Sequence, residues 1–112
     1  MKQEGILALI KIGETQEVEF KEGCPSGHKL AEIICGLANT DGGKILLGVG
    51  DSGNIIGIKT TNTLKSQIQS YARNIDPPIV VETGEVGDVL VLHIPEGNKK
   101  PYSVNGQFFL RI

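Results

Sequence analysis

An amphipathic helix that leads directly into a buried strand is the strongest structural signal in the chain. Apolar side chains between residues 30 and 38 recur at the three- and four-residue spacing that places them along one side of a helix. Residues 39–43 (Asn-Thr-Asp-Gly-Gly) end this helix, since Asn and Gly readily adopt the left-handed conformations that close helices. The apolar run over residues 44–50 is typical of a buried strand. The sequence therefore predicts a helix packed against a sheet.

Shorter patterns on either side of this segment predict the remaining elements. They are a short N-terminal helix ended by Gly13, a strand over 17–21, a strand over 54–58 that returns from a turn at 51–53, a helix over 63–75 with Asn62 as its N-cap, strands over 79–81 and 89–94 across a turn at 84–88, and a hairpin at Asn105-Gly106. Asp76-Pro77-Pro78 ends the second long helix, because the residue before a proline avoids helical dihedrals. We expect one α+β domain over residues 1–112, with a mixed, mostly antiparallel sheet and two main flanking helices.

Composition limits the class of protein. With 39% hydrophobic and 21% charged residues, the chain of 112 residues resembles ordinary globular proteins. Its apolar runs are too short to span a bilayer, and the N-terminus lacks a secretory signal. The cysteines, Cys24 and Cys35, are too few for a disulfide framework, which predicts a cytoplasmic protein with reduced thiols and no membrane partner. The chain stops at Arg111-Ile112 inside a predicted strand, so we expect the N-terminal fragment of a longer protein.

The glycine-rich run at 48–53 and the two histidines could suggest a binding or catalytic site, but both have a simpler structural interpretation. Residues 48–53 match G-x-G-x-x-G, but a strand rather than a helix is expected next, so we interpret the glycines as a hairpin turn. His28 and His93 are far apart and have no neighbouring Cys or His. No nucleophilic triad or phosphate-binding loop is therefore evident.

Carboxylates gather before and within the first strand. Four glutamates lie within nine residues, at positions 14, 17, 19 and 22, with Lys21 among them. Glu14, Glu19 and Asp51 are candidate ligands of Mg²⁺ or Mn²⁺, because metal-dependent phosphodiester cleavage needs converging carboxylate oxygens, and Lys21 would position phosphate or water. The alternative is a solvated strand face and a turn aspartate, which local spacing cannot distinguish from a site.

The net charge of −2 argues against a strong nonspecific binder of nucleic acid. A local basic surface remains an alternative, since phosphate contacts need only a few well-placed cations. The candidate phosphate-binding residues are Lys21, Lys44, Lys99, Lys100 and Arg111.

Several of these segments together resemble one family. Glu14 with Glu-Phe-Lys at 19–21, the run ANTDGGKILLGVGDSGNIIG at 38–57, Lys-Pro-Tyr at 100–102 and FFLRI at 108–112 are similar to the Schlafen AlbA-like domain. This resemblance covers nearly the whole chain. In the family, the domain occurs in DNA-binding regulators and RecG-helicase-related proteins of bacteria and archaea, and in animal Schlafen endoribonucleases that use three carboxylates. The resemblance places Glu14, Glu19 and Asp51 at those three positions.

Three functions follow as expectations. The first is a nucleic-acid (DNA) binding domain of a transcriptional regulator-like protein, which requires no cofactor. The second is a nuclease that uses Mg or Mn, and the third is a dimerisation module in which an edge strand near the C-terminus pairs between two copies. DNA and RNA are both open as partners, and so is a homodimer.

Overall fold

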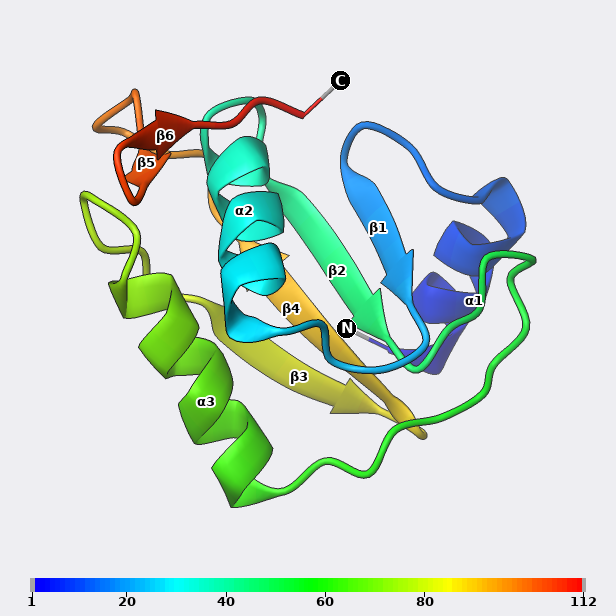
Figure 1. The fold of residues 1–112 in the computed structure, drawn as a ribbon. Coiled ribbons are helices and arrows are strands. Elements are labelled where there is room, and N and C mark those ends of the chain that lie inside the picture. Colours follow the sequence, from blue (N-terminus) through cyan, green and yellow to red (C-terminus); the bar gives the residue numbers. More distant parts are fainter. Residues whose placement is uncertain (1, 112) are drawn as a thin grey trace.

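Four strands form the main sheet, in the order β1-β2-β4-β3 (Figure 1). β1 (Val18–Lys21) and β2 (Gly43–Leu47) are parallel, whereas β4 (Val89–Ile94) runs antiparallel to both β2 and β3 (Glu82–Val86). A small separate hairpin of β5 (Ser103–Val104) and β6 (Gln107–Phe108) turns at Asn105-Gly106, where both residues have positive φ as predicted. The computed structural model describes residues 2–111, and it confirms the α+β class with a mixed, mostly antiparallel sheet.

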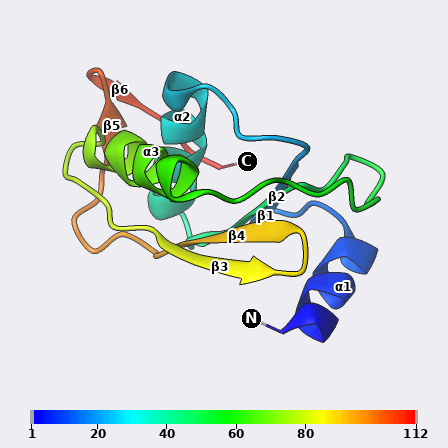
Figure 2. The same ribbon diagram turned by 90° about the horizontal axis from the view of Figure 1, so that it is seen from below.

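The helices cover both faces of this sheet. α2 (Gly27–Ala38) and α3 (Asn62–Arg73) lie on one face, and the short α1 (Gln3–Ile12) lies on the other (Figure 2). The apolar stripe of α2 packs with α3 and the inner sheet face in the larger core, while Ile6 of α1 joins Phe20 and Leu46 in the smaller one. Among residues 2–111, no helix has the length and apolar character needed to cross a bilayer.

Gly42 and Gly43 connect α2 to β2 where the backbones of neighbouring segments lie very close. A Cβ on Gly43 would clash with the Glu17 carbonyl, and a Cβ on Gly42 would lie 2.6 Å from the Glu96 nitrogen. Both residues have positive φ (74° and 156°). Their absent side chains therefore let β2 begin beside β1.

The predicted strand over residues 54–58 is wrong. Only one isolated bridge, between Val49 and Ile55, follows the turn. The N–H groups of Ile56 and Gly57 both donate to the Gly48 carbonyl, and Gly57 has a φ of 90°. These bonds turn the chain away after one pair, so the segment continues as an irregular crossing to α3, which confirms that no helix directly follows the glycines.

The predicted strand over residues 79–81 is also misplaced. β3 begins at Glu82, and the connecting turn is confined to Gly87-Asp88 rather than spread over 84–88. The backbone of Val81 is held instead by the side chain of Gln69, which donates to its carbonyl at 2.6 Å and accepts from its nitrogen at 3.4 Å. As an edge strand with exposed positions, β3 needs few apolar residues, so the apolar run just before it was misleading.

Thr61, rather than the predicted Asn62, is the N-cap of α3. Its hydroxyl accepts a hydrogen bond of 3.0 Å from the Leu64 nitrogen. We expect Thr61→Ala to lower the free energy of unfolding by about 1 kcal/mol, because an orphan N–H of the first turn loses its partner. Asn62→Ala is the matched control and should change it by less than about 0.5 kcal/mol. Urea denaturation of both variants measures the difference, and equal losses would contradict this assignment of the cap.

Candidate functional site

Three chain segments meet near the carboxyl end of β1. The N–H groups of Gly48 and Val49 donate to the Lys21 carbonyl at 2.7 and 3.1 Å, so the turn that carries Asp51 lies beside β1. The same turn reaches α1, since a Cβ on Gly53 would lie 3.2 Å from a methyl carbon of Ile10. Glu14 follows the end of α1 directly, and Glu19 lies within β1. The fold thus gathers the acids that sequence spacing alone could not bring together.

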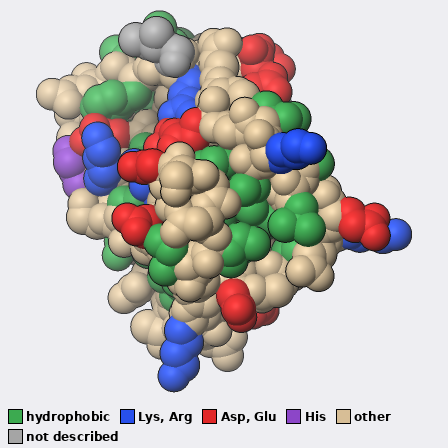
Figure 3. Space-filling model, turned by 90° about the vertical axis from the view of Figure 1, so that its right-hand side faces the viewer, with side chains coloured by type: hydrophobic (Ala, Val, Ile, Leu, Met, Phe, Trp, Pro, Cys, Tyr) green, Lys and Arg blue, Asp and Glu red, His purple; other side chains and the backbone are tan. Residues whose placement is uncertain are grey.

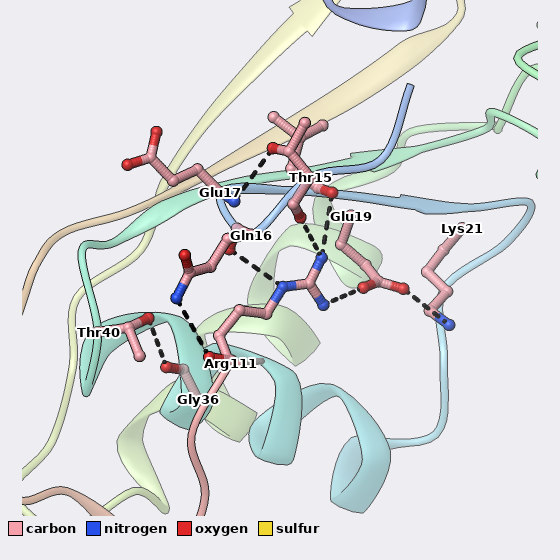
Figure 4. A network of polar contacts seen from close by, with 9 residues as sticks. Thr15, Gln16, Glu17, Glu19, Lys21, Gly36, Thr40 and Arg111 are labelled. Atoms are coloured by element: carbon pink, nitrogen blue, oxygen red, sulfur yellow. Dashed lines mark hydrogen bonds and ion pairs between the residues drawn. The ribbon is translucent and has the colours of Figure 1, made fainter. Parts of the chain in front are cut away.

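Glu19 is buried and bound by two cations (Figure 4). One of its carboxylate oxygens pairs with Nη1 of Arg111, and the other lies 3.2 Å from Nζ of Lys21. Burial alone would raise the pKa of Glu19, but the hydrogen bonds from Arg111 and Lys21 outweigh it and hold the pKa below its usual range. Glu19 is therefore a buried anion whose charge is compensated within the chain.

Arg111 has a structural role that its sequence position did not reveal. Its Nε donates to the Gln16 carbonyl at 3.1 Å, and its Nη2 donates to the carbonyls of Thr15 and Val18 at 2.9 and 3.1 Å. With the Glu19 pair, these bonds fasten the C-terminal segment to β1 and the loop before it (Figure 4). The partners are separated by more than ninety residues in sequence, so no local pattern could indicate them.

Glu14 and Asp51 complete the acidic group. The pKa of Glu14 is raised, first by partial loss of hydration and then by repulsion from Glu19 and Asp51, against weaker attraction from Lys21 and Arg111. Glu14 is therefore affected by the charges of both Glu19 and Asp51. Figure 3 looks onto the side of the molecule that bears α1 and β1, where acidic, basic and hydrophobic side chains lie next to one another at the surface.

The present arrangement does not fit a bound metal ion. Within the part of the chain that the structure describes, no three His, Cys, Asp or Glu side chains form a group that could hold one. Both oxygens of Glu19 are occupied by Arg111 and Lys21. A role for Glu14, Glu19 and Asp51 as metal ligands, with Lys21 beside them, stays a prediction.

The raised pKa of Glu14 leads to a test of the acidic group. A carboxyl whose pKa is higher in the folded state than its reference value of 4.5 destabilises the fold above that pH, where it must ionise. We expect Glu14→Gln to raise the free energy of unfolding at pH 7 by less than about 1 kcal/mol, since the side chain is exposed, with no gain at pH 3.5. Urea denaturation at both pH values measures this. The exposed Glu22→Gln is the control, and an equal gain there would count against the coupling.

The other candidate phosphate-binding cations lie elsewhere. Lys100 pairs with Glu96 at 2.9 Å and donates to the Thr40 carbonyl, while Lys99 is exposed. Lys44 lines an open cavity at the opposite end of β1 and β2, together with His93, whose pKa is lowered by burial and then by Lys44. Three carboxylates line the same cavity: Glu17, Asp41 and Glu82. The five cations therefore do not form one basic surface.

The cysteines and His28 were the other potentially reactive side chains in the sequence. Cys35 is fully buried in the larger core, and its thiol donates to the Tyr102 carbonyl. Burial raises the pKa of both Cys35 and Cys24, which disfavours the reactive thiolate. His28 lies 2.6 Å from Glu32, one turn later on α2. The side chains of Cys35 and His28 thus make contacts within the fold.

Comparison with known proteins identifies a family and a similar solved structure. The family model described as "Schlafen, AlbA_2" matches residues 14–112. Among solved structures, the crystal structure of the DIP2311 protein from Corynebacterium diphtheriae matches with a TM-score of 0.64 and 26% sequence identity. The match covers 97% of this chain and 24% of that chain, so this chain spans about a quarter of the length of that protein.

Proposed function

The chain belongs to the Schlafen AlbA_2 family, and from this premise we propose that it is the nucleic-acid-binding domain of a longer, regulator-like protein. Domains of this family are often associated with nucleic acids. The observation that carries the proposal is the uneven distribution of charge along the chain. Residues 52–75 contain Lys59, Lys65 and Arg73 but no Asp or Glu, although the whole chain has a net charge of −2.

This acid-free segment is exposed on the outside of the fold. Lys59 and Arg73 are exposed, and among residues 2–111 no carboxylate lies within ion-pair distance of either. Lys65 has a single long contact of 3.6 Å with Glu85. By contrast, Lys21, Lys100 and Arg111 are paired with carboxylates. The cations of residues 52–75 are therefore more available to phosphates than most of those selected from the sequence.

Salt dependence of binding tests the proposal. We expect a mixed-sequence DNA duplex to bind the chain at low salt, with an affinity that falls linearly on a log–log plot against KCl concentration. The double variant K59A/R73A should weaken binding and reduce the slope by about one for each lost phosphate contact. The control K2A/K11A removes two exposed lysines at α1, on the other face of the sheet. No binding at low salt, or equal losses in both variants, would overturn the proposal.

A metal-dependent nuclease is the second candidate, and it is favoured by the hydrogen bonds from Gly48 and Val49 to the Lys21 carbonyl, which hold the turn bearing Asp51 beside β1. When bound, Mg²⁺ or Mn²⁺ would supply the activation of water or phosphate. Because Glu19 is paired with Arg111, this candidate requires that pair to open. Cleavage of RNA and DNA with Mn²⁺ or with EDTA tests it: metal-dependent product that is lost in E14Q and D51N, but kept in the control E22Q, supports the nuclease. Absence of metal-dependent product contradicts it.

Homodimer formation stays a prediction, and sedimentation velocity at several protein concentrations tests it.

A further inference from the structure

The outward face of α3 is polar, exposed and unused by the fold. Six side chains line a shallow open hollow along it: Asn62, Thr63, Ser66, Gln67, Ser70 and Arg73. All six residues are exposed. α3 lies at the periphery of the molecule and covers one edge of the helical layer (Figures 1 and 2). This face is therefore open to a partner.

The side chains of α3 that contact the rest of the fold lie on its other side. Leu64, Ile68 and Ala72 pack into the larger core. Gln69 holds the backbone of Val81, and Lys65 reaches Glu85. The fold therefore constrains the residue types on the inward side of α3, whereas the outward side needs only to be soluble.

Helix stability does not explain the composition of the outward face. Ser, Thr and Asn are poorer helix formers than Lys, Glu, Arg or Ala, which commonly occupy solvated helix faces. Ser66 and Ser70 nevertheless lie in the interior of α3, and no acid occurs anywhere between residues 52 and 75. Hydrogen-bonding side chains without negative charge are the composition expected of a surface that meets phosphates and base edges.

We propose that α3 lies in the major groove of duplex DNA and that its outward face reads base edges. The proposal rests on the proposed nucleic-acid binding and specifies its surface. Gln and Asn pair with adenine, Ser or Thr can contact adenine or guanine, and an α-helix fits the width of the major groove. A helix of twelve residues is about 18 Å long, enough to present several side chains along the groove. Lys59 and Arg73 near its two ends are placed to contact the flanking phosphates.

The same geometry excludes double-stranded RNA as the preferred partner. The major groove of A-form RNA is too deep and narrow for side chains on a helix to read. Duplex DNA should therefore bind with sequence preference and more tightly than duplex RNA of the same sequence. Tighter binding to duplex RNA would overturn the inference.

Selection from a randomised DNA duplex library, followed by affinity measurement, tests the inference. The wild-type chain should enrich a consensus sequence, and Q67A/S70A should reduce the ratio of consensus to random-duplex affinity by at least tenfold, as expected for the loss of one base-specific contact or more. Its affinity for random duplex should stay within twofold, and its Tm should not fall, since Ala is the better helix former. The control Q3A/A8S, on exposed positions of α1, should keep the wild-type ratio.

Failure of this inference differs from failure of the proposed function. Salt-dependent binding without an enriched consensus, or with a ratio unchanged in Q67A/S70A, overturns the reading of bases by α3 and leaves nucleic-acid binding in place. Absence of any duplex binding at low salt overturns both.

Discussion

Replacing Arg111 with alanine is expected to lower the free energy of unfolding by about 3 kcal/mol at pH 7. The guanidinium pairs with buried Glu19 and donates to three backbone carbonyls, so the substitution removes several charge-assisted bonds at once. It also leaves Glu19 with Lys21 as its one remaining cation. Breaking one side of a buried ion pair costs more than the pair contributes, because the remaining charge stays desolvated.

Urea denaturation of R111A beside K100A measures this effect. Lys100 pairs with exposed Glu96, so K100A should cost less than about 1 kcal/mol. Arg111→Lys keeps the charge but loses the planar fork that reaches several acceptors, and it should fall between the two. A loss in R111A no larger than in K100A would contradict the structural role of Arg111.

The loss in R111A should also depend on pH. The pKa of Glu19 is lower in the folded protein than its reference value of 4.5, so its ionisation stabilises the fold above that value. As the pH falls through the lowered pKa, Glu19 becomes protonated and that stabilisation disappears. The difference between wild type and R111A should therefore shrink from pH 7 to pH 3. A constant difference would assign the effect to the carbonyl contacts alone.

The periodicity of apolar residues was sufficient to predict the helix and strand that form most of the core. The apolar stripe of α2 and the run in β2 predicted both elements to within a few residues, because burial on one side imposes a regular spacing. Edge elements were less predictable. β3 is partly exposed and needs little apolar sequence, and the crossing at 54–58 is directed by backbone bonds to Gly48 rather than by side-chain pattern.

The candidate site was predicted by residue type but not by its contacts. Glu14, Glu19 and Asp51 were selected as acids, and the turn that carries Asp51 lies beside β1, which carries Glu19, while their role as a site stays a prediction. The pairing of Glu19 with Arg111 was missed because it joins the first strand to the end of the chain. The outward face of α3 has no charged motif in the sequence, because its distinguishing feature is the lack of Asp and Glu over residues 52–75.

Asn39 shows how one motif residue can hold distant segments together. Its side-chain nitrogen donates to the carbonyls of Tyr102 and Phe109 at 2.9 and 2.8 Å, and its oxygen accepts from the Tyr102 nitrogen at 2.6 Å. Tyr102 is buried, so its N–H depends on Asn39 for a hydrogen-bond partner, whereas its carbonyl also accepts from the Cys35 thiol. The asparagine at the end of α2 therefore attaches the C-terminal hairpin together with the backbone bridge between Asp76 and Ser103, whose two hydrogen bonds are each 2.9 Å long.

We expect Asn39→Ala to lower the free energy of unfolding by about 3 kcal/mol, because the Tyr102 N–H and the carbonyls of Tyr102 and Phe109 lose the hydrogen bonds that Asn39 makes to them. Asn74→Ala is a closely matched control. Asn39 and Asn74 are the C-caps of α2 and α3, both in the right-handed helical conformation, but Asn74 is exposed and no side-chain hydrogen bond involves it among the described residues. N74A should change the free energy by less than about 0.5 kcal/mol.

Hydrogen exchange separates the loss of this attachment from a general loss of stability. In N39A, the amide of Tyr102 should exchange faster than global unfolding allows, whereas amides of β2 and β4 should follow the global free energy. Asn39→Asp should retain partial protection of Tyr102, because a carboxylate still accepts its N–H but cannot donate to the two carbonyls. If N39A and N74A have equal effects on stability and on exchange at Tyr102, the hairpin is held instead by its bridge to Asp76 and its apolar contacts with α2.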